Sequence, residues 1–171
     1  SHDNLVSQIK GAAQRFSLND KDRALSFLPL AHIFERMVMM FYISRSVAIF
    51  FVDDLTKIGE NLHLVKPTIM TVVPRLLEKL FAKIRDKSSS GSFVKRKLAG
   101  CALERSLSKN VEQKKSVADI FYDKVIYKKY RQALGGKMDL MICGGAALSE
   151  DMERFYRNIG INLFCGYGLT E

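Results

Sequence analysis

Short runs of apolar and β-branched residues recur along the chain, and stretches with helical periodicity lie between them. The runs occupy residues 24–28, 47–52, 68–73, 138–143 and 161–165. Strands that alternate with helices at this spacing are typical of βαβ units. The chain is therefore expected to have an α/β fold, with a mostly parallel sheet that is flanked by helices.

Helical periodicity predicts the elements that connect these strands. They cover residues 4–16, 32–44, 55–65, 74–87 and 150–158. The segment 32–44 is apolar on most sides, so we expect a well-buried helix there, and a buried strand at 47–52. The apolar stretch 37–52 contains Arg45 and falls short of the roughly 20 residues that a membrane-spanning helix needs.

One segment departs from this alternation. Residues 88–92 are rich in serine and glycine, which predicts a loop, and 93–134 predict two basic, amphipathic helices with a break near 114–116. We interpret this part as a helical insertion between two strands. The chain is accordingly divided into βα units at 1–87, the helical insertion at 88–137, and a βαβ unit with ligand-binding motifs at 138–171.

The formal net charge of +9 is concentrated in one region. Residues 75–137 hold 17 Lys and Arg against 6 Asp and Glu, whereas the rest of the chain holds 10 against 12. A solvated face is the favoured interpretation of such a region, and peripheral contact of 93–134 with an anionic membrane is the main alternative. Nucleic acid is not expected as a partner, because aromatic residues do not alternate with the charges to form a stacking platform.

The three cysteines, Cys101, Cys143 and Cys165, lie far apart in the sequence and form no CxxC pair. This scatter argues against a disulfide framework and against a zinc site, and it favours a reducing compartment. The polar start, residues 1–4, does not resemble a secretory signal peptide. We therefore expect a cytoplasmic protein, with any membrane contact peripheral.

Two glycine-rich segments, 144–148 and 166–171, follow predicted strands. Paired glycines allow a ligand to approach the backbone closely, and the carboxyl ends of parallel strands are where ligands bind in such sheets. In the second segment, Tyr167 offers a stacking surface, Thr170 can hydrogen-bond a phosphate, and Glu171 can hold a hard cation such as Mg²⁺. Each segment alone predicts little more than a tight turn, but together they predict a nucleotide pocket.

These segments also carry a resemblance to a known family. Gly166-Tyr167-Gly168-Leu169-Thr170-Glu171 resembles the YGxTE motif of the acyl-adenylate-forming superfamily, and Gly144-Gly145-Ala146-Ala147-Leu148 is similar to its adenine-pocket segment. Residues 28–36 (LPLAHIFER) resemble a segment of its long-chain fatty acyl-CoA synthetase branch, and residues 1–5 resemble the stretch after its phosphate-binding loop. The order and spacing match over the whole chain, which is thus similar to an internal fragment of the AMP-binding N-terminal domain.

The resemblance implies a role for individual residues. Nucleotide-binding roles are implied for Gly144, Gly145, Ala146, Gly166, Tyr167, Gly168, Leu169 and Thr170. Tyr167 would stack on adenine, Thr170 and Glu171 would act in catalysis, and Glu171 would hold Mg²⁺. His32 would lie near the acyl-adenylate and the route of the thiol. The implied reaction activates a long-chain fatty acid with ATP as an acyl-adenylate and then transfers the acyl group to coenzyme A.

The chain also departs from the family pattern. Cys165 stands where many relatives have Gln before the GYGxTE segment. The family's phosphate-binding loop would lie before Ser1, and its ribose-binding aspartate, hinge and catalytic lysine would lie after Glu171. We therefore expect the 171 residues alone to make no acyl-CoA.

Other interpretations remain open on sequence grounds. The chain could belong to an adenylate-forming ligase for another carboxylic acid, or to a basic lipid- or membrane-binding module without a nucleotide site. His32 could be a histidine packed in the core. The cluster of Met37, Met39 and Met40 predicts core packing, with the lining of an acyl tunnel as the alternative.

Overall fold

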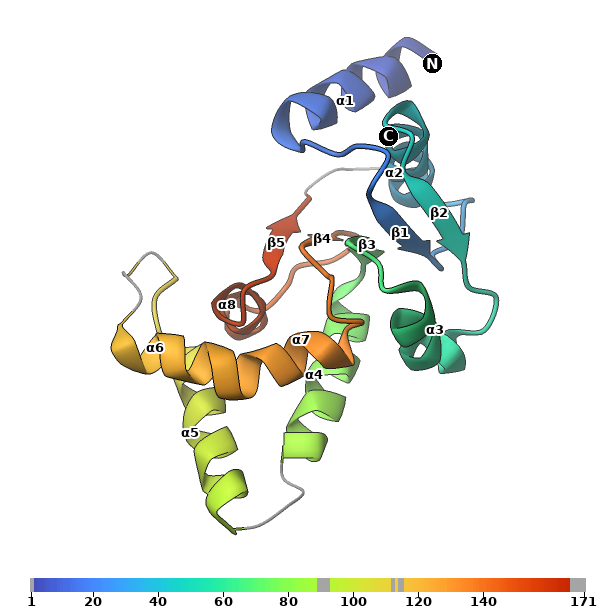
Figure 1. Ribbon diagram of the computed structural model, residues 1–171. Coiled ribbons are helices and arrows are strands. Elements are labelled where there is room, and N and C mark those ends of the chain that lie inside the picture. Colours follow the sequence, from blue (N-terminus) through green and yellow to red (C-terminus); the bar gives the residue numbers. More distant parts are fainter. Residues whose placement is uncertain (1, 89–92, 112, 114–115, 167–171) are drawn as a thin grey trace.

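Figure 1 shows the computed structural model of the chain, which describes residues 2–88, 93–111, 113 and 116–166. Five strands form one sheet in the order β2-β1-β3-β4-β5, and every pairing is parallel. The strands are β1 (Arg23–Ser26), β2 (Ala48–Phe51), β3 (Ile69–Val72), β4 (Leu140–Cys143) and β5 (Asn162–Cys165). The predicted α/β fold with a parallel sheet is confirmed.

The helices lie where the periodicity predicts them. They are α1 (His2–Arg15), α2 (Ile33–Ser44), the 3₁₀ turn η1 (Leu55–Lys57), α3 (Ile58–Val65), α4 (Pro74–Ser88), α5 (Phe93–Ser108), α6 (Val117–Tyr122), the π-helical η2 (Asp123–Tyr127), α7 (Lys128–Ala133) and α8 (Glu150–Asn158). Helices α6, η2 and α7 follow one another without a gap, so the region 93–134 holds two helical stretches. The predicted break falls between them, although residues 114 and 115 themselves lie outside the described part of the chain.

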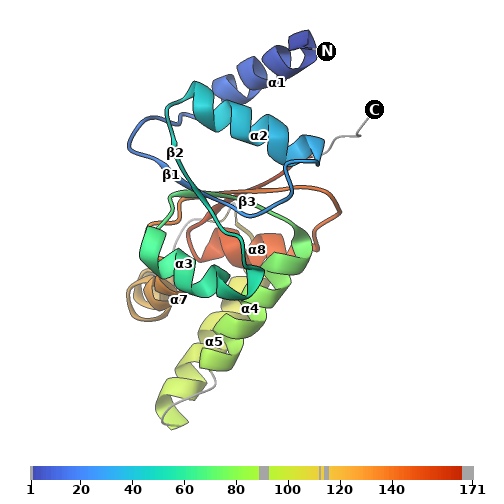
Figure 2. The ribbon, with the colours of Figure 1, turned by 90° about the vertical axis from the view of Figure 1, so that its right-hand side faces the viewer.

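Helices cover both faces of the sheet (Figure 2). On one face α1 and α2 pack against strand residues such as Ala24, Ile69 and Ile142. On the other face α3, α4, α5, α7 and α8 pack against the alternating residues of the same strands, among them Leu25, Met70 and Met141. This alternation explains the continuously apolar central strands β3 and β4, because helices on both faces of a parallel sheet bury the side chains that point to either face.

The direction of the chain accounts for this division of the helices. From β1 the chain crosses to β2 in one direction, and from β2 through β3 and β4 to β5 it moves the other way. Crossover connections between parallel strands are right-handed, so a reversal of direction moves the connecting helix to the opposite face. Helix α2 therefore lies alone among the crossover helices on its face, with α1 beside it.

Two burial expectations are wrong. Strand β2 lies at one edge of the described sheet and is only partly covered, with Phe51 66% exposed. Helix α2 buries only the side that faces the sheet, and Met40 and Ile43 are 43% and 59% exposed on the other side. Apolar composition could not reveal either result, because exposure depends on which neighbours a strand or helix has.

Among the described helices, none combines the length and apolar character that a membrane crossing requires.

Paired glycines, Gly135 and Gly136, end the second helical stretch. Gly136 N–H donates to Arg131 O at 2.8 Å, Gly135 N–H donates to Gln132 O at 3.0 Å, and both glycines have positive φ. This pattern is a C-terminal helix cap in which the glycines adopt the left-handed backbone conformation. Gly135 also lies against α3, where a Cβ atom would come within 2.4 Å of Leu62 O.

We expect Gly135→Ala to lower the free energy of unfolding by about 2 kcal/mol or more, because the new Cβ meets backbone at a positive φ. Gly100→Ala is the matched control. Gly100 lies inside α5, and a Cβ there meets nothing within 4 Å. The control should raise stability by about 0.5–1 kcal/mol through helix propensity. Urea denaturation measures both, and equal effects of the two substitutions would contradict the assigned cap.

Candidate nucleotide-binding site

The carboxyl ends of the strands share one edge of the sheet, since all pairings are parallel. Neighbouring strands β1 and β3 send their next helices, α2 and α4, to opposite faces of the sheet. In open α/β sheets, ligands bind at the carboxyl edge beside such a point, because the diverging connections leave a crevice between them. The topology therefore places the candidate site beside the ends of β1, β3 and β4.

The segment that follows β4 presents backbone at this edge. Gly144 is buried and its N–H donates to Val72 O at 3.1 Å, which continues the ladder between β3 and β4. Gly145 follows with φ of +84°, a conformation that a side chain disfavours, and it is exposed together with Ala146. The chain thus turns away from the sheet and leaves the peptide groups of 145 and 146 open to a ligand. This is the approach that the paired glycines predict.

An aromatic ring packs directly on this backbone. A Cβ atom added to Gly144 would lie 2.6 Å from the ring of Phe34, which belongs to the first turn of α2. Only glycine therefore fits at this position unless the ring moves. The same ring lies 3.8 Å from the Cβ position of Gly166, which is ordinary contact. Phe34 was not predicted as a site residue, although it belongs to the segment LPLAHIFER that carries the family resemblance.

His32 lies at the N-cap position of α2 and is exposed. Its backbone N–H donates to Pro29 O at 3.0 Å, its O accepts from Arg36 N–H at 3.1 Å, and its side chain makes no capping bond within the described residues. The interpretation of His32 as a core histidine is therefore wrong. Because Phe34 of the same turn contacts Gly144, His32 belongs to the same edge of the sheet as the glycine segment. Its predicted place near the acyl group stays a prediction.

The second glycine-rich segment is described only at its first residue. Gly166 N–H donates to Cys143 O at 2.8 Å, so the ladder between β4 and β5 extends to the start of the motif. Tyr167, Gly168, Leu169, Thr170 and Glu171 lie outside the described residues, and their predicted roles stay predictions. Within the described part of the chain, no group of three His, Cys, Asp or Glu side chains could hold a metal ion.

A buried carboxyl group lies beneath α2. The Ser26 hydroxyl donates to Glu35 Oε1 at 2.6 Å, and Tyr42 and Thr71 share a hydrogen bond of 3.0 Å nearby. Glu35 is 1% exposed, and its Oε2 has no hydrogen-bond partner among the described residues. Burial raises the pKa of Glu35, and the hydrogen bond from Ser26 opposes the rise only in part. This contact ties the first turn of α2 to the last residue of β1, beside Phe34.

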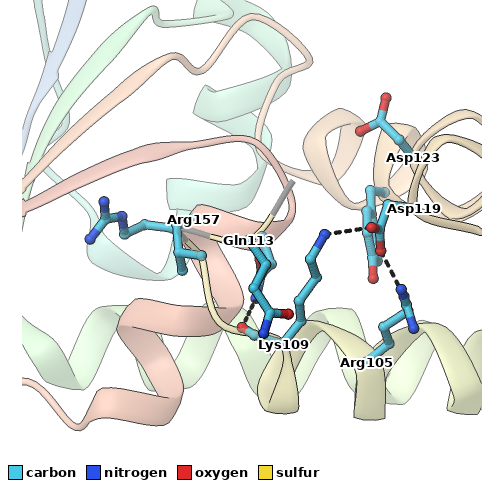
Figure 3. Close-up of a pocket in the computed structure, with 9 residues that line it drawn as sticks. Arg105, Lys109, Gln113, Asp119, Asp123 and Arg157 are labelled. Atoms are coloured by element: carbon cyan, nitrogen blue, oxygen red, sulfur yellow. Dashed lines mark hydrogen bonds and ion pairs between the residues drawn. The ribbon is translucent and has the colours of Figure 1, made fainter. Parts of the chain in front are cut away.

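A small hollow elsewhere in the structure is lined by charged and polar side chains (Figure 3). It has a volume of about 70 Å³ and is lined in part by Arg105, Lys109, Asp119 and Asn158. Asn158 ends α8 just before β5 begins, so the hollow lies toward the amino edge of the sheet, opposite the glycine segments. Arg105 and Lys109 both pair with Asp119. Burial opposes the ionisation of Asp119, but these hydrogen bonds outweigh it and hold its pKa well below the ordinary value. We interpret the hollow as a structural ion-pair network.

Comparison with known proteins gives an independent result. A family model described as AMP-binding enzyme matches residues 1–171. Long chain acyl-CoA synthetase 3 of Arabidopsis thaliana is 38% identical over 158 residues, which cover 90% of this chain and 24% of that protein. Long-chain-fatty-acid–CoA ligase 1 of Cavia porcellus is 34% identical over 180 residues, which cover 100% of this chain and 25% of that protein. The chain thus spans about a quarter of the length of these curated relatives.

Two solved structures illustrate the similarity of the fold. The N-terminal domain of FACL13 from Mycobacterium tuberculosis, in an inhibitor-bound crystal structure, aligns with a TM-score of 0.62 at 19% identity over 99% of this chain and 32% of that one. The A domain of carboxylic acid reductase from Segniliparus rugosus, in complex with AMP and a co-purified carboxylic acid, aligns with a TM-score of 0.62 at 22% identity over 98% of this chain and 25% of that one. At these identities the likeness concerns the fold.

The Glu35 carboxyl group should make stability depend on pH. Because burial raises its pKa above the ordinary value of 4.5, the folded state binds the proton more tightly than the unfolded state. Stability is then lost as pH rises from the ordinary pKa through the folded pKa. We expect Glu35→Gln, which can still accept a hydrogen bond from Ser26, to gain stability relative to the unchanged protein across this window.

Urea denaturation at a series of pH values measures this difference. Glu60→Gln, a change of the same chemistry at an exposed position of α3, controls for the loss of one negative charge. A stability difference between Glu35→Gln and the unchanged protein that does not vary with pH would contradict a buried, neutralised carboxyl group.

Proposed function

Because the chain belongs to the AMP-binding enzyme family, we propose that the protein containing it activates a long-chain fatty acid with ATP and transfers the acyl group to coenzyme A. The observation that carries the proposal is the match of 90–100% of this chain, at 34–38% identity, to proteins named long-chain acyl-CoA synthetase or ligase. The geometry supports it, because an exposed glycine turn and the start of α2 meet at the carboxyl edge of a parallel sheet.

The adenine is proposed to bind against the segment after β4. Gly144, Gly145 and Ala146 would form one wall of its pocket, since the last two are exposed and Gly144 packs against the Phe34 ring. Tyr167 would supply the opposite wall by stacking. A planar base between a peptide backbone and an aromatic ring gains contact on both faces.

The phosphates and the metal are assigned to the end of the second motif. Thr170 would hydrogen-bond the α-phosphate, and Glu171 would hold Mg²⁺ through its carboxylate, as hard cations prefer oxygen ligands. When bound, Mg²⁺ neutralises charge on the triphosphate. The chain's own part in the first step would be to orient the nucleotide so that the fatty acid carboxylate can reach the α-phosphorus.

The acyl group and the coenzyme A thiol are proposed to reach the site beside His32. This residue is exposed at the start of α2, and Phe34 of the same turn contacts Gly144.

The cluster of Met37, Met39 and Met40 lies on α2. Met39 is buried, with 8% of its surface exposed, whereas Met40 is 43% exposed. The described contacts of Met37 are with the core beneath α2, which supports core packing.

We expect Glu171→Gln, made in the whole protein, to slow the step that releases pyrophosphate by at least about tenfold, because the variant keeps shape but loses the charge that holds Mg²⁺. High Mg²⁺ should restore part of the rate. Thioester formation from a supplied acyl-adenylate should change little. Pyrophosphate release and acyl-CoA formation are measured separately.

An equal fall in both half-reactions would show that Glu171 supports the structure and does not hold the metal. The unchanged protein should also prefer palmitate over acetate and benzoate. Adenylation of an aryl or short acid alone would replace the long-chain assignment with a ligase for another carboxylic acid. Absence of nucleotide binding in the whole protein would favour a lipid-binding module.

We also propose that the protein is cytoplasmic and contacts an anionic membrane through the basic helices. The outer end of α5 lies far from the sheet (Figure 1) and exposes Phe93 and Val94 at 71% and 73%, next to the exposed Arg96 and Lys97. Apolar side chains beside basic ones suit the interface of a membrane, where the apolar groups enter and the charges meet lipid phosphates.

We expect reversal of Arg96 and Lys97 to Glu to weaken binding to vesicles that contain phosphatidylserine by about tenfold or more, because each basic residue near such a surface contributes about 1 kcal/mol. Reversal of Lys10 and Lys21, which are exposed but lie outside 93–134, is the control with the same change of charge. Vesicle flotation at two salt concentrations measures the effect. If both pairs of substitutions weakened vesicle binding equally, or if binding did not depend on salt, the region would be interpreted as a solvated face.

A further inference from the structure

Two cysteines face each other at the edge that carries the candidate site. Cys143 and Cys165 are the last residues of β4 and β5 and are direct partners in the parallel register. The two thiols influence each other's pKa, which agrees with their direct pairing in the register. Cys143 is 2% exposed, whereas Cys165 is open to solvent. Their separation of 22 positions in the sequence argued against a disulfide framework, and only the register of the strands brings the two residues together.

The backbone geometry suits a bond between the two sulfur atoms. Neighbouring strands lie about 4.8 Å apart, within the range of Cα separations that disulfides span. Partners in a parallel register project from the same face of the sheet, so the two Sγ atoms lie on one side. The hydrogen bond of 2.8 Å from Gly166 N–H to Cys143 O holds this register at the point where the strands end.

We propose that Cys143 and Cys165 are a redox modification site, at which a reversible disulfide joins the ends of β4 and β5 and alters the backbone at the adjoining Gly144 and Gly166. A regular ladder does not bring two short side chains to the ideal geometry of a disulfide, so closing the bond strains the strand ends. Strained disulfides are more easily reduced than structural ones, which makes this bond suited to regulation in a reducing compartment.

A low-molecular-weight disulfide such as glutathione disulfide is the oxidant. The exposed Cys165 loses its proton to water and attacks one sulfur, which forms a mixed disulfide and releases one glutathione thiolate. Cys143 then loses its proton and attacks Cys165 Sγ, which forms the Cys143–Cys165 bond and releases the second glutathione thiolate. The two protein thiols are oxidised by two electrons, and glutathione disulfide is reduced to two molecules of glutathione.

The surroundings of the two thiols fix the order and the pace of these steps. Burial raises the pKa of Cys143 to about 12, so its attack is the slow step at neutral pH. Burial and the nearby Glu153 carboxylate raise the pKa of Cys165, and the neighbouring Cys143 thiol opposes that shift. Because the thiolate is the attacking species, oxidation should become faster as pH rises.

The first test uses the chain with Cys101→Ser, which removes the exposed cysteine of α5. The folded chain is treated with glutathione disulfide, the remaining thiols are alkylated, and the peptides are analysed by mass spectrometry. Both thiols should be lost together into one linked peptide that contains Cys143 and Cys165, and a thiol reductant should restore them. Cys165 carrying glutathione while Cys143 stays alkylatable would overturn the proposal.

Two controls test whether the disulfide depends on the strand register of the folded chain or only on the reactivity of the thiols. With Cys165→Ser in the same background, the buried Cys143 should stay unmodified. In guanidinium chloride the linked peptide should give way to separate glutathione adducts. A linked peptide that forms in equal yield in the denatured chain would show that the folded geometry is not responsible.

The second test rests on the proposed function and uses the whole protein. Oxidation should lower the rate of adenylation, a reductant should restore it, and Cys165→Ser should make the ratio of oxidised to reduced rates close to one. If the disulfide is found by mass spectrometry but the adenylation rate of the active protein is the same with and without it, the regulatory role is overturned. A linked peptide in a protein that shows no adenylation when reduced would instead reject the proposed function and leave the modification site standing.

Discussion

A sheet whose strands all run parallel must be covered on both faces, and most of this structure follows from that requirement. The strands bury alternating side chains in two separate cores, so each needs a helical layer. The crossover helices that form those layers also bring every strand back to the same starting edge. The start of α2 and the glycine segment after β4 consequently lie at the opposite, carboxyl edge, which is where ligands bind in open α/β sheets.

Local signals were sufficient to predict the elements, and insufficient to predict their contacts. Apolar runs and helical periodicity placed the strands and helices within a few residues, and the glycines after β4 were correctly assigned to a turn at the carboxyl edge. The exposure of Phe51 was missed because edge position is a property of the whole sheet. The packing of Phe34 on Gly144 and the pairing of Cys143 with Cys165 were missed because both arise from register between distant segments.

The start of α2 links the interior to the candidate site. Glu35 is held by Ser26 at the end of β1, and the preceding residue, Phe34, presses its ring on the backbone of Gly144. A buried polar contact is more directional than apolar packing, so it fixes the rotation of the helix about its axis. The shape of the glycine wall is therefore set partly by a carboxyl group that no ligand touches. The family resemblance in LPLAHIFER covers both residues, which agrees with a shared structural task.

The position of the helical segment between β3 and β4 has a consequence for how the chain folds. These strands are neighbours in the sheet, yet residues 73–139 separate them. Pairing them early would close a long loop at a large loss of chain entropy. Helices α4, α5 and α7 shorten that loop when they form and pack, because each replaces a flexible stretch by a rigid one. The central pairing of the sheet therefore depends on local contacts made elsewhere, and the rate of folding should be governed by how quickly the helical segment collapses.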